Sequence, residues 1–210
     1  TMLSCNLFCV IRMEKQMFVF IRGAGDLATG ISVRLYRAGI KICHSDLAIP
    51  TAVRRNVAFS EAIRLGKTEV EGIEAVLAQS PEDVFRQMEE GKVPVVIDEG
   101  KEMLKKLKPY AVVDAIIAKK NLGTEITDAN VVIGVGPGFT AGVDCHAVIE
   151  SKRGHNLGRV ILNGSAMKNT GVPGIIQGFG IERVLRAPSD GIMEDTVPIG
   201  TLVEKGDICA

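Results

Sequence analysis

The sequence is poor in aromatic residues and contains no tryptophan. Only 4% of its 210 residues are Phe, Trp or Tyr, whereas glycine occurs 23 times. Such a chain builds its core from Val, Ile, Leu and Ala and makes many tight turns. This balance is commoner in α/β proteins than in β-sandwiches, so we predict an α/β fold.

The chain also lacks a surplus of charge of either sign. Its 25 Lys and Arg residues are matched by 25 Asp and Glu residues. A general nucleic-acid binder needs an excess of basic residues to displace counterions, so we expect no nucleic-acid partner. No apolar stretch approaches the roughly 18 residues of a spanning helix, so we expect no membrane partner.

The cysteines give no disulfide framework. They are odd in number, widely scattered and without zinc-ligand spacing, at Cys5, Cys9, Cys43, Cys145 and Cys209. This pattern favours a reducing compartment, and we expect a cytoplasmic protein.

Residues 1–16 differ from the rest of the chain. Their apolar stretch is too short for a signal peptide and lacks a basic start and a cleavage site. Met13 and Met17 stand just before the first clear strand. We therefore expect a leader over 1–16 that is not native, then a domain over 17–151 and another over 152–210.

The first domain alternates strands and helices. A buried strand is predicted from residue 18, followed by a glycine turn, a helix up to Gly39 and a second strand ending near Asp46. Such a unit requires a right-handed parallel crossover. Further along the chain, the patterns predict helices over 51–65, 80–91 and 103–107, a hairpin over 67–77, and strands over 93–97, 111–113 and 131–133. Pro94 limits its strand to an edge or places the proline among the first residues.

The glycine turn fits the dinucleotide-binding pattern G-x-G-x-x-G/A. Its residues are Gly23, Ala24, Gly25, Asp26, Leu27 and Ala28. The first glycine allows the turn, the second lets the backbone approach a pyrophosphate, and the small last residue packs closely. The helix start adds N–H donors and a positive dipole end. Asp46 lies at the distance of an acid that binds a ribose hydroxyl. A turn that serves packing alone remains the alternative.

Asp26 is unusual inside such a turn, because its carboxylate repels a phosphate unless a cation or an arginine offsets it. It indicates a hydroxyl-rich ligand, a metal-bridged phosphate or no phosphate. Arg54 and Arg55 come after the second strand, where they either meet an anion such as a 2′-phosphate or cover a solvated helix face.

A second group of candidate residues comes after the strand at 131–133. Gly134, Gly136 and Gly138 predict a backbone anion-binding nest, or else a loop that needs positive φ. Asp144 and His146 are candidates for proton transfer, or else structural polar residues near a turn. If residues 144–150 form one strand, Asp144, His146 and Glu150 lie on the same face. Glu150 is then too far from His146 for both to bind one metal, and the metal-ligand set stays unassigned.

Beyond residue 150, short apolar pieces alternate with glycines, which predicts a β-rich domain. Residues 187–191 and 199–206 look like one half of a barrel-sandwich domain that carries biotin or lipoate. Eighteen residues separate Lys168 from that half, whereas the modified lysine belongs in a tight hairpin only a few residues away. We therefore expect no modification of Lys168.

Longer motifs together resemble the bacterial selenium-dependent molybdenum hydroxylase accessory proteins. They occupy residues 21–30, 50–55, 57–62, 113–123, 134–146, 154–158 and 169–174, and the resemblance runs from about residue 18 to 210. The motif positions are Gly23, Gly25, Asp26, Asn121, Gly136, Gly138, Asp144, His146, His155 and Asn156. In the family the barrel-sandwich half continues past a segment like 206–210, which predicts a truncated second domain.

The resemblance implies a role in the maturation of molybdenum hydroxylases of the xanthine-dehydrogenase type that need a labile selenium. The implied partner is such a hydroxylase, and the implied ligand is a nucleotide, the molybdenum cofactor or its dinucleotide form. Two alternatives stay open. One is an NAD(P)-dependent oxidoreductase, although no Tyr-x-x-x-Lys signature is present, and the other is a non-catalytic docking scaffold.

Overall fold

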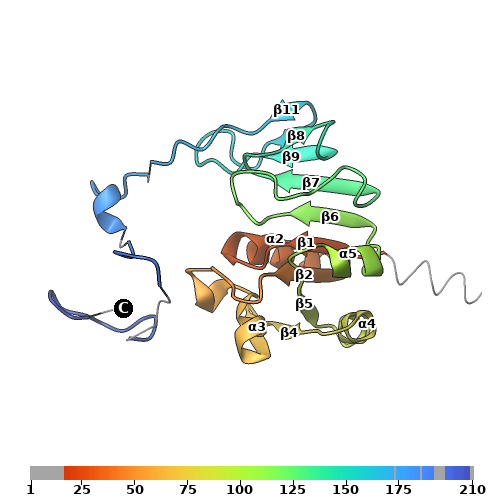
Figure 1. The fold of residues 1–210 in the computed structure, drawn as a ribbon, viewed down its shortest axis with the longest axis horizontal. Helices are drawn as coiled ribbons and strands as arrows, with labels where there is room; N and C mark the ends of the chain where they lie inside the picture. The colour runs from red at the N-terminus through yellow and green to blue at the C-terminus, as the bar shows by residue number, and fades with distance from the viewer. Residues whose placement is uncertain (1–16, 173, 185, 192–196, 209–210) are drawn as a thin grey trace, which may run out of the picture. The chain divides into compact units, whose positions relative to one another are not determined.

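The computed structural model describes residues 17–172, 174–184, 186–191 and 197–208 (Figure 1). The chain divides into two compact units, one up to Asn169 and one from Thr170 onward. The first unit contains a nine-stranded, mostly parallel sheet with helices, so the predicted α/β class is confirmed.

The sheet has the strand order β10-β9-β7-β6-β1-β2-β5-β4-β3. Its strands are β1 (Val19–Arg22), β2 (Ile42–Asp46), β3 (Lys67–Val70), β4 (Ile73–Leu77), β5 (Val93–Ile97), β6 (Ala111–Asp114), β7 (Val131–Val135), β9 (Ala147–Ile149) and β10 (Val160–Ile161). The edge strands β3 and β10 are antiparallel to their neighbours, and the others are parallel. The run β5-β2-β1-β6-β7-β9 has the order 3-2-1-4-5-6 along the chain, the order of the Rossmann fold. A separate two-stranded sheet pairs β8 (Thr140–Ala141) with β11 (Gly164–Ser165).

Both faces of the sheet are covered around β1 (Figure 1). The helices are α2 (Asp26–Arg37), α3 (Glu61–Leu65), α4 (Pro81–Glu89) and α5 (Glu102–Leu107). Phe20 packs in the cluster that contains residues of α4 and α5, whereas Ile21 packs with residues of α2. Successive side chains of a strand point to opposite faces, so the continuous apolar run of β1 is buried on both.

Several local predictions are confirmed. The Ser80 side chain accepts the Asp83 N–H at the start of α4, and Pro81 is its first residue. Residues 67–77 form an antiparallel hairpin that turns through positive φ at Glu71 and Gly72. Pro94 is the second residue of β5, and the pairing of β5 with β2 begins one residue later.

The predicted helix over 51–65 is wrong. Helical turns cover only η1 (Arg55–Val57) and α3. The backbone between them bonds to the glycine turn and α2 instead: the Phe59 N–H donates to Thr29 Oγ1, and the Ser60 N–H donates to the Ala24 carbonyl. The Phe59 side chain is fully buried in this segment.

The predicted second domain begins at residue 152, but β10 and β11 belong to the first unit. Within the described ranges from 170 onward, the regular structure consists of the 3-10 turn η2 (Ile181–Arg183) and an isolated bridge between Ile176 and Phe179. In the part of the chain that the structure describes, no helix has both the length and the apolar character needed to cross a membrane.

Candidate functional site

A crevice of about 390 Å³ opens at the carboxyl ends of β1, β2, β5 and β6. Its described lining comes from residues of the glycine turn, Ser45–Leu47, residues 51–54, Asp98 and Glu99, Ala115–Ile117, Arg22 and Leu122. The chain leaves β1 toward β2 and later crosses to β6 on the other side of β1. In doubly wound folds this switch point is where ligands bind.

The peptide between Gly23 and Ala24 is held from both sides by β2. His44 Nδ1 lies 2.8 Å from the Gly23 carbonyl oxygen, and Asp46 Oδ2 accepts the Ala24 N–H at 2.8 Å. Alternate residues of a strand share one face, so a single strand supplies both contacts. The orientation of the glycine turn is therefore fixed before any ligand arrives.

His44 is a site residue that the sequence patterns did not reveal. Its side chain is fully buried and packs edge-on against Phe59, with ring centroids 5.6 Å apart. Burial lowers its pKa to about 4, against a smaller opposing effect of the Gly23 hydrogen bond. The neutral ring donates from Nδ1, and Nε2 has no hydrogen-bond partner among the described residues. The signal available in the sequence was the position of His44 two residues before Asp46, the acid that ends β2.

Asp46 lies in the crevice, where it was predicted to bind a ribose hydroxyl. Besides the Ala24 N–H, its carboxylate accepts the Leu47 N–H at 2.8 Å. An ionised carboxylate has about four acceptor sites, so it keeps capacity for a ligand hydroxyl. The ribose contact stays a prediction.

Gly25 differs from the other glycine of the turn. A Cβ on Gly23 would lie 3.0 Å from backbone atoms of Ala115 and Ile116, and its φ is +91°. Gly25 has φ −68°, which any residue adopts, and a Cβ there would meet nothing within 4 Å. Neither conformation nor packing against this chain requires glycine at 25, so its missing side chain leaves open space in the crevice.

The remaining turn residues surround that space. Asp26 is the first residue of α2 and forms an ion pair with Arg54. An arginine that offsets this acid is therefore present, and it lies on the crevice lining instead of on a helix face. Ala28 is buried against the sheet, whereas Leu27 is half-exposed at the crevice.

A buried ion pair lies beside the crevice, and its arginine contributes to the lining. Arg22 Nη1 lies 3.1 Å from Asp114 Oδ2, and both side chains are almost fully buried. The two residues are register partners at the ends of β1 and β6. The Thr124 hydroxyl donates to the same Asp114 oxygen at 2.5 Å, and Arg22 Nη2 donates to the Leu122 carbonyl. The predicted strand ran into Asp114, but nothing local indicated its partner.

The second glycine turn lies outside the described lining of the crevice. A Cβ on Gly134 would lie 2.5 Å from the Phe139 ring, one on Gly136 would lie 2.6 Å from Ser151 Oγ, and one on Gly138 would lie 2.6 Å from the Lys120 backbone. Gly136 and Gly138 also have positive φ. Packing and conformation therefore account for these glycines, and the Gly136 N–H is already bonded to the Ile149 carbonyl.

Asp144 and His146 do not share a strand face, so that prediction is wrong. β9 begins only at Ala147. Asp144 lies in a turn before it, where its own N–H donates to the Thr140 carbonyl. Asp144 Oδ2 accepts the Thr140 N–H at 2.7 Å, and His146 Nδ1 accepts the Val132 N–H at 2.9 Å. Within the described ranges, no hydrogen bond or ion pair joins the two side chains.

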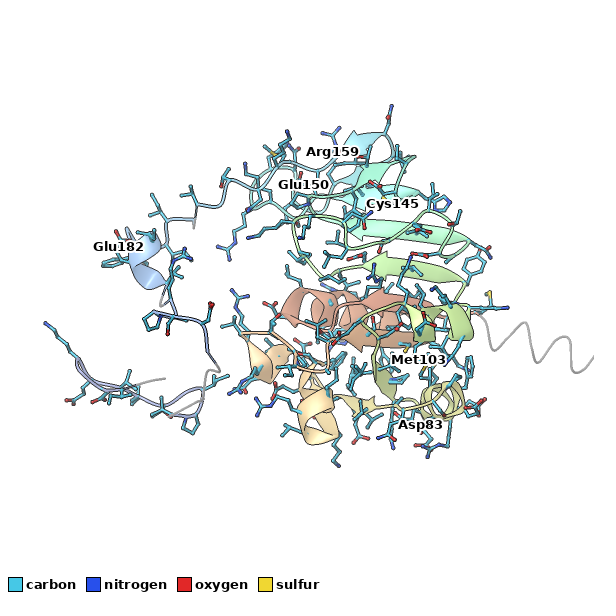
Figure 2. The ribbon with its side chains drawn as sticks, viewed as in Figure 1. Asp83, Met103, Cys145, Glu150, Arg159 and Glu182 are labelled. Atoms are coloured by element: carbon cyan, nitrogen blue, oxygen red, sulfur yellow. The ribbon has the colours of Figure 1, made fainter. Side chains whose placement is uncertain are left out.

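Two other polar residues from the sequence patterns also make local bonds to backbone groups. Glu150 accepts the N–H groups of Lys152 and Met167 at 2.8 Å, and Figure 2 shows it with Cys145 at the β9 end of the sheet. Asn121 bonds to the Thr124 backbone. In the described part of the chain, no group of three or more His, Cys, Asp or Glu residues could hold a metal ion.

The chain is 52% identical over 192 residues to "Uncharacterized protein YqeB" of Escherichia coli (strain K12). The match covers 91% of this chain and 36% of the relative, so the chain spans about a third of the length of the curated relative it matches. No protein-family model matches the chain, and no solved structure matches it.

Proposed function

We propose that this protein binds a nucleotide in the crevice and acts as an accessory protein in the maturation of selenium-dependent molybdenum hydroxylases. The ligand is a nucleotide or the nucleotide-bearing molybdenum cofactor, and the partner is the hydroxylase. The observation that carries the binding claim is the open space at Gly25, where neither backbone nor packing calls for glycine.

The start of α2 supplies the chemistry for a phosphate. Helix bonding begins with the Thr29 N–H, which donates to the Gly25 carbonyl. The first-turn N–H groups before it have no partner within the helix, and the helix dipole favours negative charge there. A phosphate above Gly25 would meet these donors, and Asp46 would face the adjoining ribose.

The accessory role is supported by where the resembling motifs lie. Residues from the motifs at 21–30, 50–55 and 113–123 all contribute to the lining of the one crevice. These segments are distant in sequence, and their convergence on one crevice supports the proposed binding.

Titration calorimetry with the full chain tests the proposal. The ligands are the cytidine-dinucleotide form of the molybdenum cofactor, CDP, ADP, NAD⁺ and NADP⁺. We expect binding by the native chain and at least tenfold weaker binding by Gly25→Val, because the new side chain fills the open space. Gly30→Val is the matched control, since Gly30 is exposed on α2 and a Cβ there also meets nothing. Absence of heat with every ligand would remove the binding claim.

An NAD(P)-dependent oxidoreductase is the second candidate, favoured by the 3-2-1-4-5-6 strand order and by Asp46 at the end of β2. It requires NAD⁺ or NADP⁺ to bind more tightly than the cytidine ligands and to accept hydride from a substrate. A docking scaffold, in contrast, would keep its affinity for the hydroxylase unchanged in Gly25→Val and would bind no nucleotide.

A further inference from the structure

The charges that line the crevice are mostly negative. Its described lining includes four carboxylates, those of Asp26, Asp46, Asp98 and Glu99, and two arginines, Arg22 and Arg54. Arg22 is buried and already paired with the buried Asp114. Of the two arginines, Arg54 is therefore the one that can face a ligand, and its side chain is 69% exposed.

The Arg54 ion pair joins two walls of the crevice. Arg54 lies in the segment after β2, and Asp26 begins α2 beside the open space at Gly25. The contact joins Nη1 of the guanidinium to Oδ2 of the carboxylate. A guanidinium carries five N–H donors in a planar fork, so it can hold Asp26 and a second anion together.

We infer that Arg54 is the residue that gives the crevice its preference for a phosphorylated ligand, bridging Asp26 and the phosphate. The inference rests on the proposed nucleotide site and deepens it. Asp26 holds the Arg54 guanidinium beside the N-terminus of α2. The positive charge of Arg54 there offsets the repulsion between the Asp26 carboxylate and the phosphate. Without Arg54, the crevice presents carboxylates to its ligand and accepts a neutral nucleoside in preference to a nucleotide.

Inorganic pyrophosphate is the minimal probe, and the nucleoside–nucleotide pairs cytidine–CDP and adenosine–ADP are its companions. Arg54→Gln should weaken pyrophosphate and nucleotide binding roughly tenfold or more at low ionic strength, because charge-assisted hydrogen bonds are lost and Asp26 is left unpaired. Nucleoside binding should not change. Arg54→Lys should restore part of the loss, since it returns the charge without the fork.

The double variant Asp26→Asn/Arg54→Gln separates this mechanism from a loss of structure. Because the repelling carboxylate is removed, the double variant should bind pyrophosphate at least threefold more tightly than Arg54→Gln does. Arg37→Gln and Glu71→Gln are matched controls, because they break an exposed ion pair away from the crevice and make the same charge changes. Thermal unfolding of each variant verifies that the fold is kept.

The possible failures are distinguishable. The inference would be overturned if the native chain does not bind pyrophosphate or if Arg54→Gln binds it as tightly as the native chain. It would also be overturned if Arg37→Gln weakens binding equally, or if the double variant recovers no affinity. The proposed function would still stand if nucleotides bind the native chain at least tenfold more tightly than they bind Gly25→Val. Conversely, pyrophosphate binding that shows the expected order of variants with no nucleotide binding would sustain the inference and remove the proposed function.

Discussion

At the scale of single residues, the crevice is shaped by side chains that hold backbone groups. His44 and Asp46 fix the two polar atoms of one peptide, and Thr29 Oγ1 lies 3.2 Å from the Ala24 carbonyl. Buried polar groups are stable only when they are hydrogen-bonded, so these side chains favour a single arrangement of the turn. Such preorganisation lowers the cost of ordering a site when its ligand binds.

The buried His44 makes stability depend on pH. Its folded pKa of about 4 lies below the ordinary value of 6.5, so the unfolded chain binds the proton more readily between these values. The contribution of His44 to the free energy of unfolding is complete above about pH 6.5 and is lost as the pH falls toward 4. Between pH 7.5 and 5, the native chain should lose about 2 kcal/mol more unfolding free energy than His44→Gln.

Urea unfolding of both proteins at the two pH values measures this difference, because the carboxylates titrate alike in each. His155→Gln, at an exposed position, should behave as the native chain does. An equal loss in the native chain and His44→Gln would show that His44 is not held neutral by burial.

The buried pair between Arg22 and Asp114 should be sensitive to removal of one partner. Asp114→Ala leaves a buried guanidinium uncompensated and should lower the unfolding free energy by about 3–5 kcal/mol. Arg37→Gln removes half of an exposed pair and should change it by less than about 1 kcal/mol. Chemical denaturation measures both, and similar small losses would contradict the burial of the pair.

At the scale of elements, the start of α4 is set by neighbours in sequence. Ser80 Oγ accepts the Asp83 N–H, which satisfies a backbone donor that the first helical turn leaves open. Asp83 Oδ2 accepts the N–H of Gln79, the residue before the cap. The segment before α3 behaves differently, because its backbone bonds go to α2 and the glycine turn.

Ser80→Ala should lower the unfolding free energy by about 1 kcal/mol, because the Asp83 N–H loses its acceptor. Ser80→Asp should keep most of the stability, since aspartate is an equally good capping residue and favours the positive end of the helix dipole. Thermal unfolding compares the three proteins. A Ser80→Ala variant as stable as the native chain would exclude a capping role.

At the scale of the whole molecule, the correctly predicted parts of the fold are those that depend on patterns of residues close together in the sequence. The strand at β1, its glycine turn, the hairpin of β3 and β4 and the start of α4 each depend on residues a few positions apart. The candidate residues Gly23, Gly25, Asp26 and Asp46 likewise reached the crevice because one β-α-β unit contains them. The helix over 51–65 failed because the Phe59 N–H bonds to the distant Thr29 side chain. The strand over 144–150 failed because Asp144 closes a turn back to Thr140.

By itself, the sequence determined the α/β class and the turn between β1 and α2, since apolar runs, glycines and helix signals act over short distances. The tertiary structure alone decided which charges meet. Arg22 and Asp114 are 92 residues apart, and Arg54 and Asp26 are 28 apart. Such pairs form only when parallel pairing brings strand ends to one edge of the sheet, and that arrangement places an arginine beside the acid of the glycine turn.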